Sequence, residues 1–143
     1  MMKWVIDASV AAKWFLPPRD EQLVPEALSL LQGYRNATLQ FVVPDVFWAE
    51  FGNVLCKAVR RGRCSRRLAE AGIAELAAQR LLTVSSGGLL DEAFNIANDF
   101  NRSFYDSLYV ALAVAARIQL LTADEKLVNA LAGRFPVKWL GAL

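Results

Sequence analysis

The 143-residue chain contains no histidine. This absence excludes the Ser-His-Asp and Cys-His mechanisms, in which a histidine carries the proton. It also excludes zinc sites built on imidazole ligands, and ribonucleases that use histidine as general acid and base. Any catalysis by this chain must therefore depend on other side chains.

Cysteines and long apolar runs are also scarce. The two cysteines, Cys56 and Cys64, have no metal-ligand or redox spacing and are interpreted as ordinary reduced thiols. No secretory signal opens the chain, because Asp7 falls where an apolar segment would have to continue. The longest apolar run, 108–116, is too short to span a bilayer and is followed by Arg117. We therefore expect a cytoplasmic protein that does not enter the membrane.

The composition fits one globular unit. Hydrophobic residues make up 55% of the chain and charged residues 21%, and the formal net charge is +2. A chain of this length buries roughly two thirds of its unfolded surface, so it needs no disulfide or structural zinc. We expect a single domain over residues 1–143. The small net charge does not by itself indicate a polyanionic partner.

Short apolar runs alternate with helical patterns along the chain. The runs predict strands at 3–6, 40–43, 81–84, 119–122 and 137–140. Helices are expected at 9–16, 21–34, 44–61, 65–80, 90–100 and 125–131, with one more between Arg102 and the fourth strand. Strands that are apolar on both faces favour a parallel sheet covered by helices. The sequence thus predicts an α/β domain with five parallel strands.

Three aspartates fall where such a sheet binds ligands, at the carboxyl ends of its strands. Asp7 follows the first strand and Asp124 closely follows the fourth. Asp106 opens a helix that rises about 21 Å, and the next strand returns about 16 Å, which brings Asp106 and Asp124 to one edge. The alternative for each aspartate is a helix cap or a place in a capping box.

Glu50 is harder to explain as a surface residue. The third predicted helix carries an apolar stripe that includes Phe47, Phe51 and Val54, and Glu50 lies within or beside it. A glutamate turned toward a core is rare unless it is paired or bound to a cation. The alternative is a glutamate at the solvent border of the stripe.

The convergence of these acids would require a cation. Two carboxylates about 4 Å apart repel by about 4 kcal/mol at an effective dielectric constant of 20, so four in one pocket cannot all stay ionised alone. Mg²⁺ or Mn²⁺, which prefer oxygen ligands, are the expected cofactors. Ser9 and Thr122 are candidates for supporting hydroxyls, and Asn53 for orienting Glu50. The alternatives are capping for the hydroxyls and a solvated helix face for Asn53.

Basic residues crowd the junction between the third and fourth predicted helices. They offer a positive patch for the phosphates of a nucleic acid beside an acidic pocket that would repel a polyanion. The alternative is a set of surface charges that favour a helix C-terminus and solubility. This basic elbow consists of Lys57, Arg60, Arg61, Arg63, Arg66 and Arg67.

Four segments together resemble the PIN-domain ribonucleases, and most of all the VapC-like toxins of toxin–antitoxin pairs. They are VIDASV (5–10), VPDVFWAEFGNVL (43–55), SFYDSLYVALA (103–113) and LLTADEKL (120–127). The resemblance implies a three-layer α/β/α sandwich and a metal-binding nuclease site at Asp7, Glu50, Asp106 and Asp124. Ser9 and Thr122 also match frequent choices of that family, whereas Ser107 stands where alanine is common.

The same resemblance implies a function and partners. It implies a homodimeric toxin that cleaves RNA with a metal-activated water and is inhibited by a cognate antitoxin. A non-catalytic PIN-like module that binds RNA or protein is the alternative. A response-receiver domain is disfavoured because no second acid adjoins Asp7, and phosphate-loop and dinucleotide signatures are absent.

Overall fold

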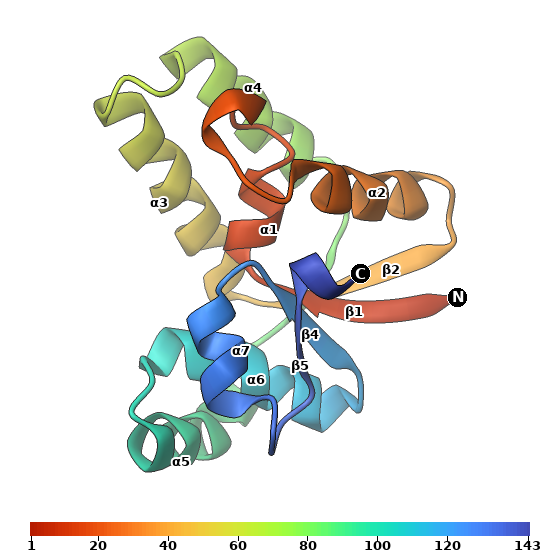
Figure 1. The fold of residues 1–143 in the computed structure, drawn as a ribbon, viewed down its shortest axis with the longest axis vertical. Helices are drawn as coiled ribbons and strands as arrows, with labels where there is room; N and C mark the ends of the chain where they lie inside the picture. Colours follow the sequence, from red (N-terminus) through yellow and green to blue (C-terminus); the bar gives the residue numbers. More distant parts are fainter.

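Five parallel strands form the central sheet of the computed structural model, which describes residues 1–143 (Figure 1). The order across the sheet is β3-β2-β1-β4-β5, so β1 lies at the centre with β2 and β4 as neighbours. The parallel five-stranded sheet expected from the sequence is confirmed. The strands are β1 (Met2–Ile6), β2 (Leu39–Pro44), β3 (Leu82–Val84), β4 (Gln119–Thr122) and β5 (Val137–Trp139).

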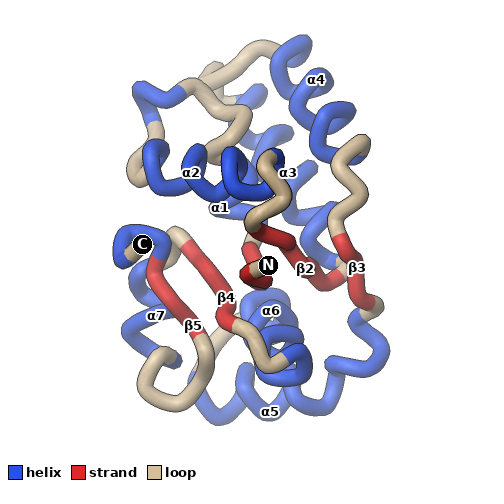
Figure 2. The backbone as a smooth tube through the Cα atoms, turned by 90° about the vertical axis from the view of Figure 1, so that its right-hand side faces the viewer, coloured by secondary structure: helices blue, strands red, loops and turns tan.

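Helices cover both faces of this sheet. Figure 1 shows α1 to α4 on one side and α5 to α7 on the other, and Figure 2 shows the strands as a band between the two layers. This is the three-layer sandwich that the sequence predicted. No helix is both long and apolar enough to cross a membrane. The helices are α1 (Ala8–Ala12), α2 (Val24–Arg35), α3 (Val46–Arg60), α4 (Arg66–Ala77), α5 (Leu90–Phe100), α6 (Phe104–Ala116) and α7 (Glu125–Leu131).

Three boundaries near prolines differ from the prediction. The first helix was expected to reach residue 16, where Pro17 and Pro18 follow, but α1 already ends at Ala12. The second begins only at Val24, with Pro25 in its first turn. Pro44 was placed in the first turn of a helix. It is instead the last residue of β2, where it pairs in register with Val84 of β3.

The buried face of α4 does not include all of its apolar residues. Ser65 caps this helix, with its hydroxyl accepting a hydrogen bond from the Leu68 amide at 3.1 Å. Leu68 and Ile73 are 43% and 44% exposed. The helix instead packs through Gly72, where an added Cβ would lie 3.2 Å from the Phe15 side chain. The close approach of the α4 backbone to Phe15 at Gly72 therefore decides which face of α4 is buried.

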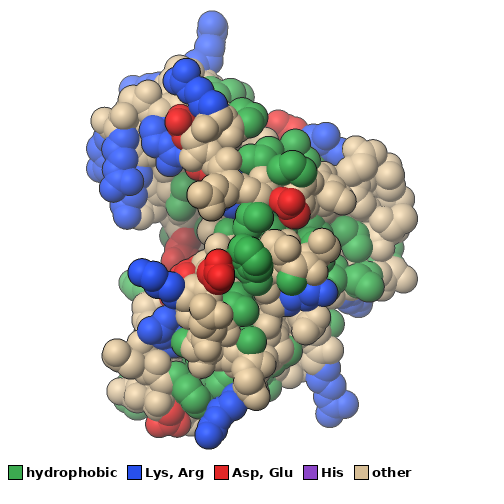
Figure 3. Space-filling view, viewed as in Figure 1, with side chains coloured by type: hydrophobic (Ala, Val, Ile, Leu, Met, Phe, Trp, Pro, Cys, Tyr) green, Lys and Arg blue, Asp and Glu red, His purple; other side chains and the backbone are tan.

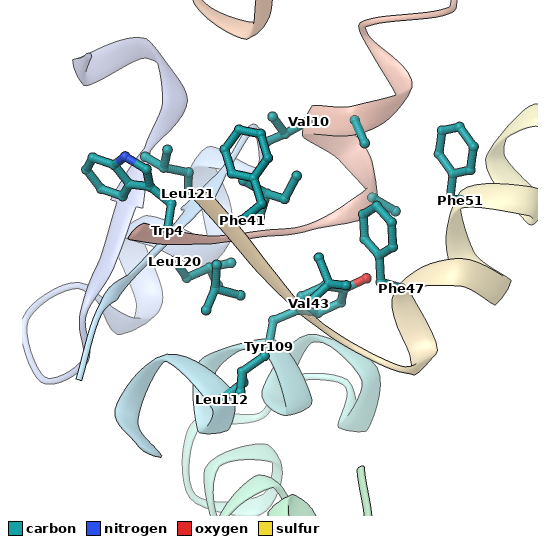
Figure 4. Close-up of a cluster of buried hydrophobic side chains, with 14 of the residues drawn as sticks. Trp4, Val10, Phe41, Val43, Phe47, Phe51, Tyr109, Leu112, Leu120 and Leu121 are labelled. Atoms are coloured by element: carbon teal, nitrogen blue, oxygen red, sulfur yellow. The ribbon is translucent and has the colours of Figure 1, made fainter. Parts of the chain in front are cut away.

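Helix α6 is the helix most deeply embedded in the fold. It is buried from Ser107 to Ala113 and contacts β1, β2 and β4. Figure 4 shows Tyr109 and Leu112 projecting from α6 toward the sheet, opposite the cluster around Phe41 and Val10. Because Asp106 precedes this buried segment, the packing of α6 fixes where that acid emerges.

Candidate active site

All four predicted acids line one pocket, of about 260 Å³, at the carboxyl edge of the sheet. In Figure 3, acidic side chains lie in a hollow on the side toward which β1 points in Figure 1. Two of the three predicted supporting residues, Ser9 and Asn53, also line the pocket. The full lining is Asp7, Ala8, Ser9, Glu50, Asn53, Val54, Lys57, Asp106, Tyr109 and Asp124.

Asp7 and Asp124 are both helix caps and pocket residues. Asp7 Oδ1 accepts hydrogen bonds from the amides of Ser9 and Val10, at 3.1 and 3.3 Å. Asp124 Oδ1 accepts from the amides of Lys126 and Leu127, at 3.0 and 3.2 Å. In each carboxylate these capping bonds end on the same oxygen, which leaves Oδ2 outside the cap.

The two predicted hydroxyls tie Asp7 to the end of β4. The Ser9 hydroxyl donates to Asp7 Oδ1 and accepts from the Ala123 amide at 3.3 Å. Thr122 is fully buried, and its hydroxyl accepts from the Asp124 amide at 3.0 Å. The Thr122 hydroxyl also opposes the increase in the pKa of Asp7. Both hydroxyls therefore help to hold Asp7 and Asp124 in place through hydrogen bonds.

Burial makes Asp7 difficult to ionise. It raises the pKa of Asp7 from 3.8 to about 6, against the opposing hydrogen bonds of Ser9, Thr122 and Val10. The negative charge of Asp106 adds to the increase. A carboxyl group in this state gains from any cation placed beside it.

Glu50 and Asp106 share this property. Burial is the main cause that raises the pKa of Glu50, and the charge of Asp106 adds to it. Burial likewise raises the pKa of Asp106, followed by the charge of Asp124, whereas Ser103 and Arg102 oppose the increase. The Asp106 amide donates to the Ser103 hydroxyl at 3.0 Å, so Ser103 rather than Asp106 caps α6. The acids thus raise one another's proton affinity across the pocket.

Two pocket residues with polar side chains were not among the predicted site residues. Tyr109 looked like part of the apolar pattern of α6, yet it lines the pocket three residues after Asp106. Lys57 was assigned to the basic elbow only, but it lies two turns after Glu50 and lines the same pocket. The i, i+3 and i, i+7 helical spacings to the acids were the available signals.

The donor set fits a hard divalent cation in its chemistry. Four carboxylates and one lysine face the pocket, and three of the carboxyl groups have a raised pKa. Carboxylate oxygens are the ligands that Mg²⁺ and Mn²⁺ prefer. As the side chains stand, no three of them are gathered closely enough to hold one ion.

Some residues of the basic elbow form ion pairs and others do not. Arg63 binds Glu21, which also binds Lys13 at 3.2 Å, and Arg66 binds Glu70 at 2.8 Å. Arg60, Arg61 and Arg67 make no ion pair. Figure 3 shows Lys and Arg side chains gathered above the hollow that holds the acids, where Figure 1 places the turn between α3 and α4.

Comparison with known proteins identifies related chains. Residues 4–131 match the family model of the PIN domain. The chain is 31% identical over 130 residues to Ribonuclease VapC3 of Pyrobaculum aerophilum, covering 90% of this chain and 94% of that protein.

Solved structures share the fold at lower identity. A Pyrobaculum aerophilum protein, PAE2754, superposes with a TM-score of 0.67 at 19% identity, over 99% of this chain and 85% of that one. A toxin–antitoxin complex from Klebsiella pneumoniae contains a chain that superposes with a TM-score of 0.61 at 15% identity, over 94% and 95%.

Proposed function

The chain belongs to the PIN domain family, and we propose that it is a metal-dependent endoribonuclease acting as the toxin of a toxin–antitoxin pair. The observation that carries the proposal is the set of four carboxylates in one pocket at the carboxyl edge of the sheet. The ribonuclease relative supports RNA as the substrate class, and the Klebsiella pneumoniae complex supports the toxin role.

Asp7, Glu50, Asp106 and Asp124 would hold Mg²⁺ or Mn²⁺. A bound cation of this kind lowers the pKa of a water and stabilises negative charge on the scissile phosphate. Asp7 and Asp124 offer their Oδ2 atoms, since the capping bonds use Oδ1. Glu50 and Asp106, which line the same pocket, would supply the remaining carboxylate oxygens. Ser9 would hold the Asp7 carboxylate through its hydroxyl, and Thr122 would hold the Asp124 amide.

Positive side chains must offset the repulsion between this pocket and a polyanion. Lys57 is placed to contact a phosphate, because it lines the pocket together with the acids. Arg60, Arg61 and Arg67 extend that attraction beyond the pocket, since no acidic partner neutralises them. Asn53, which lines the same pocket as Glu50, would orient that carboxylate.

The test is RNA cleavage by the purified chain with Mg²⁺ or Mn²⁺. We expect cleavage that EDTA abolishes and that Asp106→Asn eliminates. Asp91→Asn is the matched control, because Asp91 is an exposed acid in the first turn of α5 and outside the pocket. Cleavage without a divalent cation, or cleavage unchanged in Asp106→Asn, contradicts the proposal.

The alternative is a PIN-like module that binds RNA or protein without cutting it. One observation favours it, namely that the acids are not gathered around a common point as they stand. That reading predicts RNA binding that is indifferent to Mn²⁺ and to Asp106→Asn. The same experiment therefore separates the two functions.

Two protein partners belong to the proposal. The antitoxin would fit the groove of about 400 Å³ between α3 and α4, whose lining is mostly apolar and also carries Arg60 and the Arg66–Glu70 pair. An amphipathic acidic segment complements such a surface. A second copy of the chain would cover Leu90 and Phe94, which lie one turn apart on α5 and are 47% and 62% exposed.

A further inference from the structure

Tyr109 is the one pocket residue whose polar group has no assigned task. Tyr109 is 2% exposed and belongs to the hydrophobic core. Figure 4 shows it extending from α6 past Val43, with the oxygen pointing toward Phe47 at the start of α3. The hydroxyl is therefore the polar end of an otherwise apolar residue, and it faces the acids.

That hydroxyl is buried and makes no hydrogen bond. A buried tyrosine hydroxyl normally finds a partner, because losing water without replacement is unfavourable. Phenylalanine would fill the same space without leaving an unpaired oxygen. The ring alone thus does not explain the hydroxyl.

Glu50 lines the same pocket as Tyr109 and is a carboxylate that interacts with this hydroxyl. Burial, then the neighbouring Glu50 carboxylate, raises the pKa of Tyr109, so the phenol keeps its proton and can act only as a donor to an acid. The hydroxyl in turn opposes the increase in the pKa of Glu50. Asp7 and the Ala8 backbone are the other groups that influence the phenol.

We infer that Tyr109 is a positioning residue, whose hydroxyl donates a hydrogen bond to the Glu50 carboxylate and holds it toward the cation. This inference rests on the proposed metal-dependent function. A glutamate has three rotatable side-chain bonds, and the acids as they stand do not bring three carboxylates around one point. A fixed donor on the rigid α6 selects one orientation of Glu50 and leaves the second carboxylate oxygen for the metal.

The experiment is Mn²⁺ binding to the full chain, measured by isothermal titration calorimetry. Outer partners of metal ligands commonly change metal affinity by about 10- to 100-fold, so we expect Tyr109→Phe to weaken Mn²⁺ binding at least about tenfold. Tyr105→Phe is the matched control, because Tyr105 lies in the same helix and is 58% exposed. It should bind Mn²⁺ like the parent protein.

A double-mutant cycle tests whether the effect passes through Glu50. In a Glu50→Gln background, Tyr109→Phe should cause no further loss of Mn²⁺ affinity. Equal losses in both backgrounds would overturn the inference, because they indicate a general effect on packing. Unchanged Mn²⁺ affinity in Tyr109→Phe, with a clear loss in Glu50→Gln, would also overturn it and leave the proposed function intact. If the parent protein binds no Mn²⁺, the proposed function fails and this role fails with it.

A second measurement does not depend on the folding of a Tyr109 variant. Ultraviolet resonance Raman spectra of the Tyr105→Phe protein report the hydrogen bonding of the two remaining tyrosines. We expect Mn²⁺ to shift the tyrosine doublet toward the donor state, because the unpaired hydroxyl acquires an acceptor. A doublet that does not change on saturation with Mn²⁺ would overturn the inference.

Discussion

Asp7 and Asp124 follow two neighbouring strands, β1 and β4, and each caps the helix that comes next. Ile6 of β1 lies in register with Leu121 of β4, and the Asp7 amide donates to the Leu121 carbonyl at 3.4 Å. Capping and metal binding looked like competing explanations for these acids. They are compatible, because the caps occupy Oδ1 and the strand pairing brings both carboxylates to the same pocket.

Asp7→Asn should stabilise the protein at neutral pH in the absence of divalent cations. The pKa of Asp7 is raised from 3.8 to about 6, so the unfolded chain ionises this group more easily than the folded one. The ionised Asp7 carboxylate therefore lowers the free energy of unfolding by about 3 kcal/mol above pH 6. This destabilisation decreases as the pH falls and vanishes below about pH 4. Asparagine keeps the cap and carries no charge. Thermal unfolding between pH 4 and 8 measures the difference.

Asp45→Asn is the opposite control for that experiment. Hydrogen bonds from the Ser86 hydroxyl and amide lower the pKa of Asp45, so its ionised form stabilises the fold at neutral pH. Its replacement should lower the melting temperature at pH 7. With saturating Mn²⁺, Asp7→Asn should become the less stable protein, since it loses a ligand. If the difference in melting temperature between Asp7→Asn and the parent protein does not change with pH, the raised pKa of Asp7 is contradicted.

Glu21→Gln should destabilise the fold by about 3 kcal/mol. Glu21 is 13% exposed and pairs with both Lys13, which is 9% exposed, and Arg63. Removing its charge leaves the Lys13 ammonium buried without an anion. Urea unfolding with far-ultraviolet circular dichroism measures the change.

The exposed pair between Arg35 and Glu75 supplies the comparison for Glu21. Its two side chains are about half exposed and 3.1 Å apart. Glu75→Gln should therefore cost less than about 1 kcal/mol. Similar losses for Glu21→Gln and Glu75→Gln would show that burial does not set the strength of the Glu21 cluster.

Replacing Arg60, Arg61 and Arg67 together with alanine should weaken RNA binding. These three arginines of the basic elbow have no acidic partner, and each phosphate contact on a single strand contributes about 0.7 to the salt slope. We expect the slope of log affinity against log salt to fall by up to about 2. Fluorescence anisotropy with labelled RNA between low and moderate salt measures it.

A triple alanine variant at Arg19, Arg80 and Arg117 removes the same charge from outside the elbow. It should keep most of the salt dependence. Equal effects of the two triple variants would indicate attraction by net charge alone, and the elbow would then have no special part in binding.

Ile73→Asp should weaken inhibition by the cognate antitoxin without reducing ribonuclease activity. Ile73 lines the groove between α3 and α4 and is 44% exposed, so the fold tolerates a polar side chain there. Leu28→Asp is the matched control, because Leu28 is 45% exposed on α2 and outside the groove. Titration of antitoxin into the RNA-cleavage assay measures inhibition. Full inhibition of Ile73→Asp would place the antitoxin elsewhere.

Local sequence signals were sufficient for much of the fold. Helix α5, strand β4 and helix α7 have the predicted bounds, because each is limited by residues that favour turns or caps. Pro44 was misplaced because proline suits both the end of a strand and the start of a helix. Its pairing with Val84, 40 residues away, decides between the two. Periodicity similarly could not show that α4 packs through Gly72.

The sequence by itself determined which acids follow strands or open helices, and the parallel order of strands then carries them to one edge. Only the tertiary structure decided which other groups join them. Tyr109 matches the apolar period of α6. Its hydroxyl becomes part of the pocket only when residues of α1 and α3 are brought to the same place by the fold. The pairing of Arg63 with Glu21 spans 42 residues. Contacts of this kind depend on the packing of whole elements, which local patterns of residues do not encode.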